Sequence, residues 1–494
     1  MSKWIKEGVP AFVVVGRINM GKSAVLATLL EVDDDRIIRV SPTPGETTHC
    51  HVLPVVFDER ELVRFIDTPG FSRPLEAMRA IQELHGEGSP DLGTVGRFVR
   101  ERGEAFDDEA RLLEPIVEGA GILYVIDPGK PLRDAFVAEM EILRWTGRPR
   151  MALLNQKGEE APHLEEWRNR LGSYFNLIRT FNAHHARFEE RKHLMRALLD
   201  IDESNRPMLE EAIGLIEEEW AERREEAADV ILDMLRKALA LRVEGRLDEE
   251  QRHSERKRER LVKDLTRRYV EKVRRIEGRS YERLLKIYRH HLMTVEDDAP
   301  AYEGIDLEAA ETWKKWGLSR GQMTVAASVA GAAGGALVDV GTGGLTHGIG
   351  TVVGAVGGAA AAFFKGADLP ELGVDPRRGM KISSGSGRTL VIGPPRNVNF
   401  PWILLDSALH HYLAISRRAH GKREETVIAG RGGESVVRGW PPGRRAAFAK
   451  WFGGCLKGTP DPHREQTAFD ELVRALEEAE RADPAMRSAP AGEP

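Results

Sequence analysis

The residues with the clearest chemical meaning form the octapeptide Gly16-Arg-Ile-Asn-Met-Gly-Lys-Ser, which has the spacing G-x-x-x-x-G-K-S. An apolar run at residues 11–15 precedes it and a helical pattern follows it, the setting in which this spacing binds phosphate. Gly16 and Gly21 let the backbone curl so that successive N–H groups point at a β-phosphate. Lys22 would supply a full charge to the β- and γ-phosphates, and the Ser23 hydroxyl would ligate Mg²⁺. The octapeptide therefore predicts a nucleotide-binding P-loop.

Two further segments follow in the order that such a site requires. Asp67-Thr-Pro-Gly comes after an apolar run at 62–66, so the Asp67 carboxylate can reach the Mg²⁺ shell and the Gly70 N–H can sense a γ-phosphate. Between the two motifs, residues 41–49 combine turn residues with hydroxyl side chains. A threonine in such a loop can close over Mg²⁺ and the γ-phosphate and be released after hydrolysis.

Apolar, β-branched runs must supply the strands that position these motifs. They occur at residues 11–15, 52–57, 62–66, 122–126, 151–154 and, more weakly, 177–181, with helical patterns at 23–30 and 132–145. Strands that alternate with helices indicate a mostly parallel sheet covered on both faces. We predict an α/β P-loop NTPase domain over residues 1–187, followed by a mainly α-helical C-terminal region.

The next segment, 188–320, is predicted to be a charged helical region. Residues 200–230 hold twelve acids and three bases, whereas 251–290 hold fifteen bases and six acids. One interpretation is an antiparallel helix pair with attracting, solvated faces. The alternative is a basic face at 251–290 that meets RNA or anionic lipid.

Residues 321–366 are predicted to form a Gly/Ala-rich apolar helical hairpin. Thirteen of these 46 residues are glycine, and small residues repeat at four-residue spacing. Such spacing lets two helix backbones approach closely, and the segment is long enough for two helices of about 20 residues in a bilayer. We predict membrane contact here, against the alternative of a glycine-packed soluble hairpin, and read Asp339 as a residue of the hairpin turn.

The rest of the chain is predicted to be a mixed α/β region at 367–480 and a disordered tail at 481–494. Strand signals occur at 389–392 and 402–405, and helical signals at 409–419, 444–452 and 467–480. The only cysteines, Cys50 and Cys455, exclude a disulfide framework and fit a reducing compartment. The N-terminus lacks a signal peptide pattern, and the net charge of −6 gives no general attraction to nucleic acid. These features predict a cytoplasmic protein, at or near the membrane if 321–366 contacts it.

Taken together, the motifs resemble those of a known family. Gly16-Arg-Ile-Asn-Met-Gly-Lys-Ser, Pro44-Gly-Glu-Thr-Thr and Asp67-Thr-Pro-Gly-Phe look like the first three motifs of the Era/TrmE-type GTPases, within the translation-factor-related class. The resemblance covers about residues 10–187. The run from Trp167 to Leu199 is similar to a bacterial subgroup that joins this domain to a C-terminal domain of unknown function. The family implies GTP hydrolysis with Mg²⁺.

The resemblance also implies roles for single residues. Lys22, Thr48 and Gly70 match the catalytic positions, and Ser23, Thr48 and Asp67 match the Mg²⁺ ligands, with Thr47 as the alternative to Thr48. Asn19 stands where potassium-activated members hold K⁺. Phe71 occupies the position of a water-orienting glutamine, so we expect slow intrinsic turnover. The predicted nucleotide-binding set is Gly16, Asn19, Met20, Gly21, Lys22, Ser23 and Ala24 at the phosphates, with Asn155, Lys157 and Ala183 at the base.

The base-reading motif departs from the family. Members usually carry Asn-Lys-x-Asp after a strand, whereas this chain has Asn155-Gln-Lys-Gly. Gly158 replaces the aspartate that accepts hydrogen bonds from guanine, and Glu159 or Glu160 is the predicted substitute. Asn182-Ala183-His184 would replace the loop that touches the base through its backbone.

The leading hypothesis is a GTPase switch whose nucleotide state changes how the helical region meets a membrane or membrane-protein partner, with oligomer formation on nucleotide binding left open. Two rival hypotheses are a nucleotide-binding interaction protein with little hydrolysis and an Era-like RNA or ribosome-assembly GTPase. Only the basic stretch at 251–290 supports the RNA hypothesis.

Overall fold

The computed structural model describes residues 3–31, 50–57, 59–158, 161–183, 185–248, 254–290, 293–295, 388–394, 400–419, 426–428 and 435–481. The predictions for 41–49 with Thr47 and Thr48, for Glu159, Glu160 and His184, for 321–366 with Asp339, and for 482–494 lie outside these residues. The chain forms two compact units, one of Met1–Ala221 with two short later segments and one that begins at Glu222. The first unit thus extends past residue 187, and the predicted domain boundaries stay predictions.

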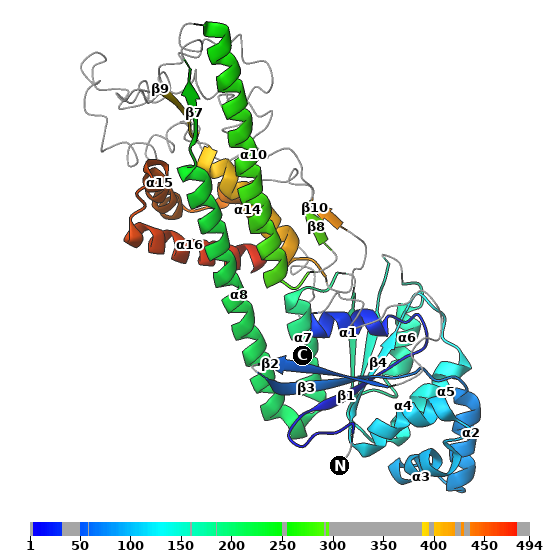
Figure 1. Ribbon diagram of the computed structural model, residues 1–494. Coiled ribbons are helices and arrows are strands. Elements are labelled where there is room, and N and C mark those ends of the chain that lie inside the picture. The colour runs from blue at the N-terminus through cyan, green and yellow to red at the C-terminus, as the bar shows by residue number, and fades with distance from the viewer. Residues whose placement is uncertain are drawn as a thin grey trace. The chain divides into compact units, whose positions relative to one another are not determined.

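The first unit is built around a six-stranded sheet in the order β2-β3-β1-β4-β5-β6 (Figure 1). The strands are β1 (Ala11–Val15), β2 (His51–Phe57), β3 (Arg60–Asp67), β4 (Gly121–Ile126), β5 (Arg150–Asn155) and β6 (Leu177–Phe181). All neighbours pair in parallel except β2 and β3. Every residue of β1 and β4 is buried, as expected for central strands covered on both faces. The predicted mostly parallel sheet is confirmed.

Helices cover both faces of this sheet. Figure 1 shows α1 and α7 on one side and α4 and α5 on the other. The helices are α1 (Lys22–Leu30), α2 (Pro74–His85), α3 (Leu92–Arg102), α4 (Asp107–Glu118), α5 (Asp134–Trp145), α6 (Leu164–Leu171) and α7 (Phe188–Ile201). No element was predicted from the sequence over residues 74–118, where α2, α3 and α4 lie. Local signals existed, because Pro74 opens α2 and the Asp91 carboxylate accepts the Thr94 N–H at 2.8 Å to cap α3.

The strand β2 forms one edge of the sheet and contains a proline. Pro54 stands opposite Arg64, and the register with β3 shifts just after it, between Val55 and Val56. The Arg64 N–H donates to the Pro10 carbonyl at 2.9 Å, away from β2, so β3 requires no donor at the position of Pro54.

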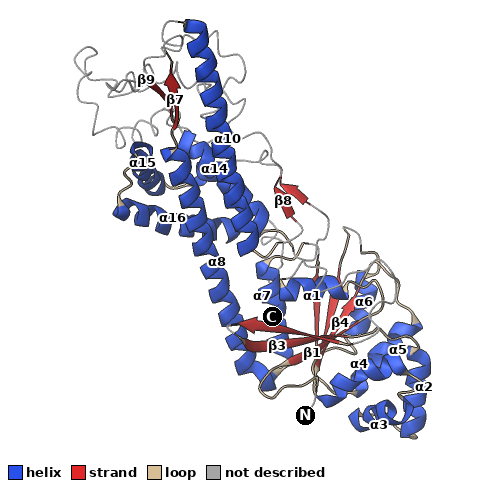
Figure 2. Ribbon diagram, viewed as in Figure 1, coloured by secondary structure: helices blue, strands red, loops and turns tan. Residues whose placement is uncertain are grey.

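The second unit is mainly helical (Figure 2). Its helices are α8 (Arg206–Ala240, which begins in the first unit after the 3₁₀ turn Glu203–Asn205), α10 (Glu255–Ile287), α14 (Phe400–Ser416), α15 (Pro442–Lys457) and α16 (Pro462–Arg481), with a 3₁₀ turn at Val436–Gly439. Two small sheets pair β7 (Val243–Leu247) with β9 (Arg388–Ile392) in antiparallel fashion and β8 (Met293–Val295) with β10 (Thr426–Ile428) in parallel. The fold-class prediction of an α/β domain followed by a mainly helical region is confirmed.

The helices α8 and α10 run antiparallel where they touch. The Tyr269 hydroxyl donates to the Ala238 carbonyl at 3.5 Å, and Arg283 lies 3.7 Å from Asp233. Asp233 also pairs with Arg236 and Lys237 on its own helix, so much of the charge balance is local. The predicted antiparallel pair therefore forms, with a smaller role for attraction between its faces than the composition indicated.

Two predictions for this unit were wrong. Residues 402–405 belong to the helix α14, in which Trp402, Ile403, Leu404 and Leu405 are all buried. A short apolar run looks the same in a buried strand and in a helix buried all round, so periodicity could not separate them. The strand β7 interrupts the region predicted to be helical, because it is stabilised by its distant partner β9.

Among the described residues, no helix has the length and apolar composition that crossing a bilayer requires.

A buried ion pair fixes the end of α1 in the first unit. Glu31, which follows α1, lies 2.9 Å from the Arg191 guanidinium of α7, and both side chains are at most 5% exposed. The Arg191 Nε also donates to the Leu29 carbonyl at 2.9 Å. This pair therefore sets the point at which the chain leaves α1.

We expect Arg191→Met to lower the free energy of unfolding by about 3–5 kcal/mol, because it leaves the Glu31 carboxylate buried without its cation. The double variant Arg191→Met/Glu31→Gln should recover a large part of this loss, since it removes the uncompensated charge. Urea unfolding monitored by circular dichroism tests this, with the exposed-helix variant Arg196→Met as the matched control. Equal losses in the single and double variants would contradict the role given to the pair.

Candidate nucleotide-binding site

The two glycines of the P-loop occupy positions where a side chain cannot fit. Gly16 follows β1 with φ +155°, and a Cβ there would lie 2.4 Å from the Val125 carbonyl oxygen of β4. Gly21 has φ +94°, and a Cβ there would lie 2.1 Å from the Asn155 Nδ2. The loop thus passes directly against the ends of β4 and β5, at the edge of the sheet where the predicted site residues meet.

Lys22 opens α1 and folds back over the loop. Its ammonium donates to the Gly16 carbonyl at 2.7 Å, and the Arg17 carbonyl lies 3.5 Å away. Burial lowers the pKa of Lys22, while the nearby carboxylates of Asp67 and Glu139 raise it. Ser23 and Ala24 follow on the same first turn, and Met20 is buried beneath the loop. The Lys22 ammonium therefore lies over the backbone of the P-loop, at the Gly16 and Arg17 carbonyls.

Asp67 ends β3 beside this lysine. Its Oδ1 is buried and accepts no hydrogen bond among the described residues. Burial raises the pKa of Asp67, whereas the charges of Lys22 and His51 lower it. An unsatisfied buried carboxylate oxygen costs free energy unless it gains a partner, and a hard cation such as Mg²⁺ prefers oxygen ligands. Asp67 and the Ser23 hydroxyl therefore fit a Mg²⁺ site; Thr48, the third predicted ligand, lies outside the described residues.

The segment after Asp67 packs tightly on the P-loop. A Cβ at Gly70 would lie 3.0 Å from the Gly16 carbonyl oxygen, and the Thr68 hydroxyl donates to the Val14 carbonyl at 3.1 Å. Phe71 is buried, so it offers no polar group to orient a water molecule. Gly70 thus lies beside the loop that it was predicted to work with.

An acidic residue that the sequence analysis missed anchors the same segment. The buried Glu109 of α4 accepts the N–H of Ser72 at 2.9 Å and that of Arg73 through one carboxylate oxygen. Both N–H groups precede α2, so Glu109 also supplies negative charge at the start of that helix. No local signal marks Glu109, because its partners are more than 35 residues away.

Asn155 joins the P-loop to the predicted base loop. Its fully buried side-chain amide donates to the Met20 carbonyl at 3.1 Å and accepts the Ala183 N–H at 3.1 Å. The Gln156 N–H donates to the Phe181 carbonyl at 2.8 Å, which fixes the ends of β5 and β6 together. The three predicted base-side residues Asn155, Lys157 and Ala183 therefore lie at one end of neighbouring strands.

Lys157 extends across the P-loop. Its ammonium donates to the Asn19 carbonyl at 2.6 Å, and the Asp127 carboxylate lies 3.6 Å away. Burial lowers the pKa of Lys157, and Asp127 raises it. The Lys130 ammonium reaches the same carbonyl at 3.4 Å. Gly158, in the place of the guanine-reading acid, has open space around its Cα.

A second buried acid holds the P-loop arginine. Arg17 Nε lies 3.1 Å from Oε1 of the fully buried Glu139 on α5, and the Tyr124 hydroxyl donates to Oε2 at 2.7 Å. Oε1 accepts no hydrogen bond in the described part of the chain, so Arg17 contributes an ion pair and Tyr124 the directed bond. Burial raises the pKa of Glu139 to about 7, although Tyr124, Arg17 and Lys22 lower it. Arg17 and Glu139 are 122 residues apart in the chain, and the sequence analysis assigned neither a role.

The C-terminal two thirds of the chain match a known family. A family model described as "Domain of unknown function (DUF3482)" matches residues 168–478. The chain belongs to this family. A second model, described as "50S ribosome-binding GTPase", matches residues 11–156, which hold the P-loop, Asp67 and Asn155. The N-terminal part is a P-loop GTPase domain of the Era/EngB type, so the resemblance drawn from the motifs is confirmed.

Relatives of the GTPase domain are distant. "Probable GTP-binding protein EngB" of Dechloromonas aromatica (strain RCB) is 28% identical over 153 residues, which are 31% of this chain and 56% of that protein. The protein of the same name from Neisseria gonorrhoeae is 28% identical over 168 residues, 32% of this chain and 66% of that protein. The chain thus spans between about half and two thirds of the length of these curated relatives.

One solved structure found is the "crystal structure of Era in complex with MgGDPNP and nucleotides 1506–1542 of 16S ribosomal RNA", with a TM-score of 0.27 and 14% identity. The match covers 57% of this chain and 98% of that one.

The described residues contain no cluster of three or more His, Cys, Asp or Glu side chains suited to a metal, and both cysteines are free.

Glu139→Gln tests the buried acid. Because the folded-state pKa of Glu139 lies above the usual value near 4.3, folding takes up a proton, and the stability of the unit falls as pH rises from about 4.3 to about 7. We expect the wild type to lose on the order of 1 kcal/mol between pH 6 and pH 8, and Glu139→Gln to lack this part of the loss.

Calorimetric melting of the full chain at pH 6 and pH 8 measures the difference, which corresponds to a few degrees. Glu141→Gln, on the same helix but paired with Arg144 nearer the surface, is the matched control. Identical pH dependence in the wild type and Glu139→Gln would show that Glu139 does not titrate in this range.

Proposed function

We propose that the chain is a Mg²⁺-dependent GTPase that hydrolyses GTP to GDP and phosphate, and that it uses the bound nucleotide as a switch for its DUF3482 region. The observation that carries the proposal is the unsatisfied Oδ1 of Asp67 beside the Lys22 ammonium. A carboxylate oxygen without a hydrogen bond and a cation held over the P-loop backbone are what a Mg²⁺-triphosphate requires.

Each residue would act through groups already in place. Lys22 would leave the Gly16 carbonyl and neutralise the β- and γ-phosphate oxygens. Ser23 at the start of α1 and Asp67 at the end of β3 would hold Mg²⁺, directly or through water, and bound Mg²⁺ would neutralise charge that develops on the phosphates. Gly70, packed on the Gly16 carbonyl, would offer its N–H to the γ-phosphate. Thr48 is the proposed switch threonine.

Slow intrinsic turnover follows from Phe71. A buried phenyl ring cannot orient the attacking water, so an additional cation or a partner would have to supply the missing stabilisation. The predicted K⁺ ion at Asn19 is one such cation. The ammonium groups of Lys157 and Lys130 already lie at the Asn19 carbonyl, and their charge opposes a further cation there.

Multiple-turnover phosphate release measures hydrolysis. We expect a slow, Mg²⁺-dependent rate that is lost in Lys22→Ala and falls at least 10²-fold in Asp67→Asn, because each removes charge from the phosphate or the metal. A matched control is Lys192→Ala, which removes a cation on α7 that pairs with Glu189 and Glu217. Equal rates in K⁺ and Na⁺ would remove K⁺ from the proposal, and a fast rate in Na⁺ alone would contradict the slow-turnover prediction.

The alternative hypothesis is a nucleotide-binding interaction protein with little hydrolysis. It shares the Asp67 and Lys22 geometry and differs only in the rate. Nucleotide binding without phosphate release above the Lys22→Ala background would favour it.

Base selectivity is the second property to measure. We propose that Glu159 or Glu160 accepts the N1–H and N2–H₂ groups of guanine in place of the missing aspartate. Calorimetry should then give tighter binding for GTP than for ITP, which lacks the 2-amino group, and tighter binding for GTP than for ATP. The preference for GTP over ITP should be about 10-fold, the contribution of one charge-assisted hydrogen bond. The double variant Glu159→Gln/Glu160→Gln should lose this preference.

Gly158→Asp is the matched gain-of-function variant, because the open space at Gly158 accepts a side chain. It should raise GTP affinity and leave ATP affinity unchanged. Equal binding of GTP, ITP and ATP by the wild type would withdraw the guanine assignment and leave a P-loop NTPase of broad specificity.

The remaining proposals concern location and partners. Contact with a membrane or membrane protein depends on residues 321–366, and together with the cytoplasmic location and oligomer formation it stays a prediction. The Era-like RNA hypothesis depends on the basic stretch, which corresponds to α10.

A further inference from the structure

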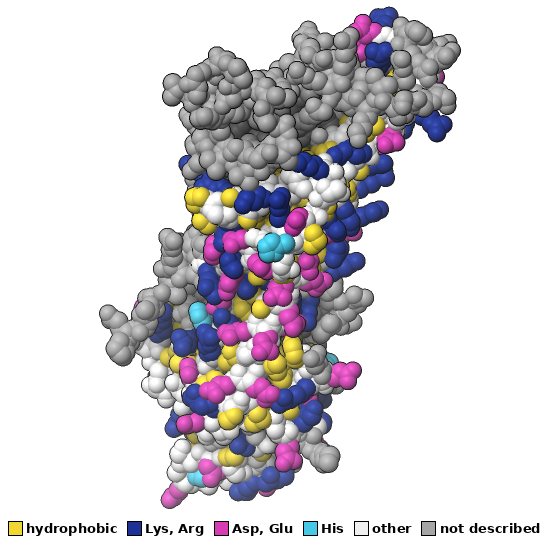
Figure 3. Space-filling model, turned by 90° about the vertical axis from the view of Figure 1, so that its left-hand side faces the viewer, with side chains coloured by type: hydrophobic (Ala, Val, Ile, Leu, Met, Phe, Trp, Pro, Cys, Tyr) yellow, Lys and Arg dark blue, Asp and Glu magenta, His cyan; other side chains and the backbone are white. Residues whose placement is uncertain are grey.

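The helix α10 carries a row of exposed bases. Six of them follow one another at intervals of three or four residues and so share one helix face: Arg268, Lys272, Arg275, Arg279, Arg283 and Lys286. We call these six residues the basic row. Lys286 lies 18 residues after Arg268, so the row extends over about 27 Å of helix at 1.5 Å per residue. Figure 3 shows a run of Lys and Arg side chains along the right-hand side of the upper half of the view.

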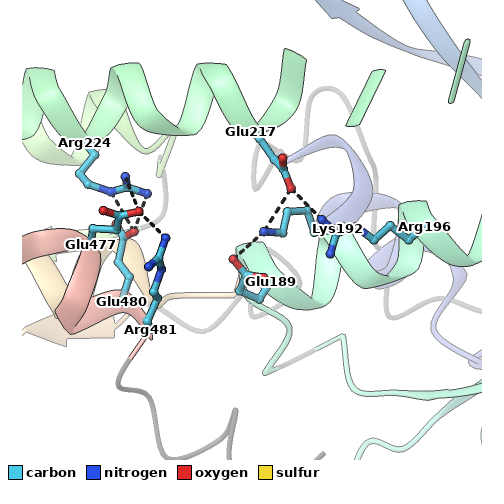
Figure 4. A network of polar contacts seen from close by, with 8 residues as sticks. All are labelled: Glu189, Lys192, Arg196, Glu217, Arg224, Glu477, Glu480 and Arg481. Atoms are coloured by element: carbon cyan, nitrogen blue, oxygen red, sulfur yellow. Dashed lines mark hydrogen bonds and ion pairs between the residues drawn. The ribbon is translucent and has the colours of Figure 1, made fainter. Parts of the chain in front are cut away.

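Most charged side chains of the helical unit already have partners. Arg224 of α8 lies 3.0 Å from Glu480 and 4.0 Å from Glu477 of α16, and Arg481 pairs with Glu477 (Figure 4). Three members of the basic row are engaged in the same way: Arg268 with Asp264, Arg275 with Glu271 and Arg283 with Asp233.

The other three members differ. Lys272, Arg279 and Lys286 make no ion pair or hydrogen bond with the residues that the structure describes, although all three are exposed. They recur every seven residues, so they lie on nearly the same line along the helix at intervals of about 10.5 Å. Three unneutralised charges in a line repel one another, and this arrangement gains most from a partner with regularly spaced negative charge.

The surroundings of the row separate the classes of anionic partner. A membrane-surface helix needs exposed apolar side chains next to its bases, and a protein interface needs a central apolar or aromatic anchor. Large apolar residues of the C-terminal half of α10 face the protein interior: Val273, Tyr281, Leu284 and Leu285 are buried. The described part of the chain exposes large apolar side chains only at Ile18, Val56 and Leu75, none of them on this helix. Among the described residues, a lipid surface or an acidic protein would therefore find charge on this helix but no apolar anchor beside it.

Single-stranded nucleic acid is also disfavoured. Its usual sites stack bases on exposed aromatic rings, whereas Tyr269, Tyr281 and Tyr288 are all buried. The phosphodiester backbone of a duplex requires only a line of exposed cations, and it carries one negative charge per about 1.7 Å of helix axis. We propose that the basic row of α10 binds the backbone of a nucleic-acid duplex, with Lys272, Arg279 and Lys286 as the principal phosphate contacts.

The proposal is independent of nucleotide hydrolysis and is tested by the salt dependence of binding. The full chain with GDP is titrated against fluorescent RNA and DNA duplexes of about 16 base pairs, against single strands of the same sequence, and against vesicles that contain anionic lipid. We expect duplex binding that weakens steeply with salt. The triple variant Lys272→Gln/Arg279→Gln/Lys286→Gln should reduce the slope of log K against log salt concentration by about 2.7, which is 0.9 for each lost contact.

A triple variant with the same net charge provides the control. Arg236→Gln/Arg474→Gln/Arg481→Gln also removes three exposed bases of the helical unit, but each of them pairs with an acid on its own helix. It should keep the wild-type slope. Circular dichroism and melting of both variants check that α10 is intact, and Lys272→Arg/Lys286→Arg should retain binding.

Comparison of the RNA and DNA duplexes identifies the source of the phosphates, and either result supports the proposal. An unchanged slope in the row variant would overturn it. So would binding to vesicles or single strands in preference to duplexes, since that would assign the row to one of the classes that its surroundings exclude.

Discussion

One buried amide holds the nucleotide site together. Asn155 donates to the P-loop at the Met20 carbonyl and accepts the Ala183 N–H of the predicted base loop. A single side chain thus bridges one loop 135 residues before it in the chain and another 28 residues after it. Gly21 can have no Cβ because Asn155 Nδ2 occupies that space. The position of the P-loop relative to the loop that carries Ala183 therefore depends on this contact, and the strand β5 brings Asn155 to it.

The same geometry shows how the altered base motif still contacts the P-loop. The family's lysine position is Gln156, but the Lys157 ammonium reaches the Asn19 carbonyl of the P-loop, so a cation spans the loop from one residue further along. The contact between a lysine and the P-loop is thus kept, whereas glycine at position 158 replaces the aspartate that reads guanine in the family. A one-residue shift suffices because a loop, unlike a strand, does not invert its side chains with each step.

The fold was predictable where the signal was local and continuous. The central strands are buried on both faces, and their apolar runs gave β1, β4 and β5 almost to the residue. The P-loop and Asp67 could be found because their signals are local. The glycine spacing indicates the curved loop, and an apolar run directly before Asp67 indicates the end of a strand. Glu109 and Glu139 could not, since each is one acid among many on a charged helix, and only the fold brings them to Ser72 and Arg17. The predictions for residues 402–405 and for the region of β7 were wrong for a related reason. Residues 402–405 lie in a helix that is buried all round, and β7 depends on a partner strand more than 140 residues away.

The proline in β2 has a consequence for the protein at high concentration. The outer rim of an open sheet presents free N–H and C=O groups, on which a second chain can add a strand and begin aggregation. Pro54 keeps its place in the ladder with β3 and leaves a missing donor on the rim. The exposed Val56 two residues later would otherwise make this rim attractive to another copy. The edge strand therefore protects the open sheet of this domain from pairing with a second copy.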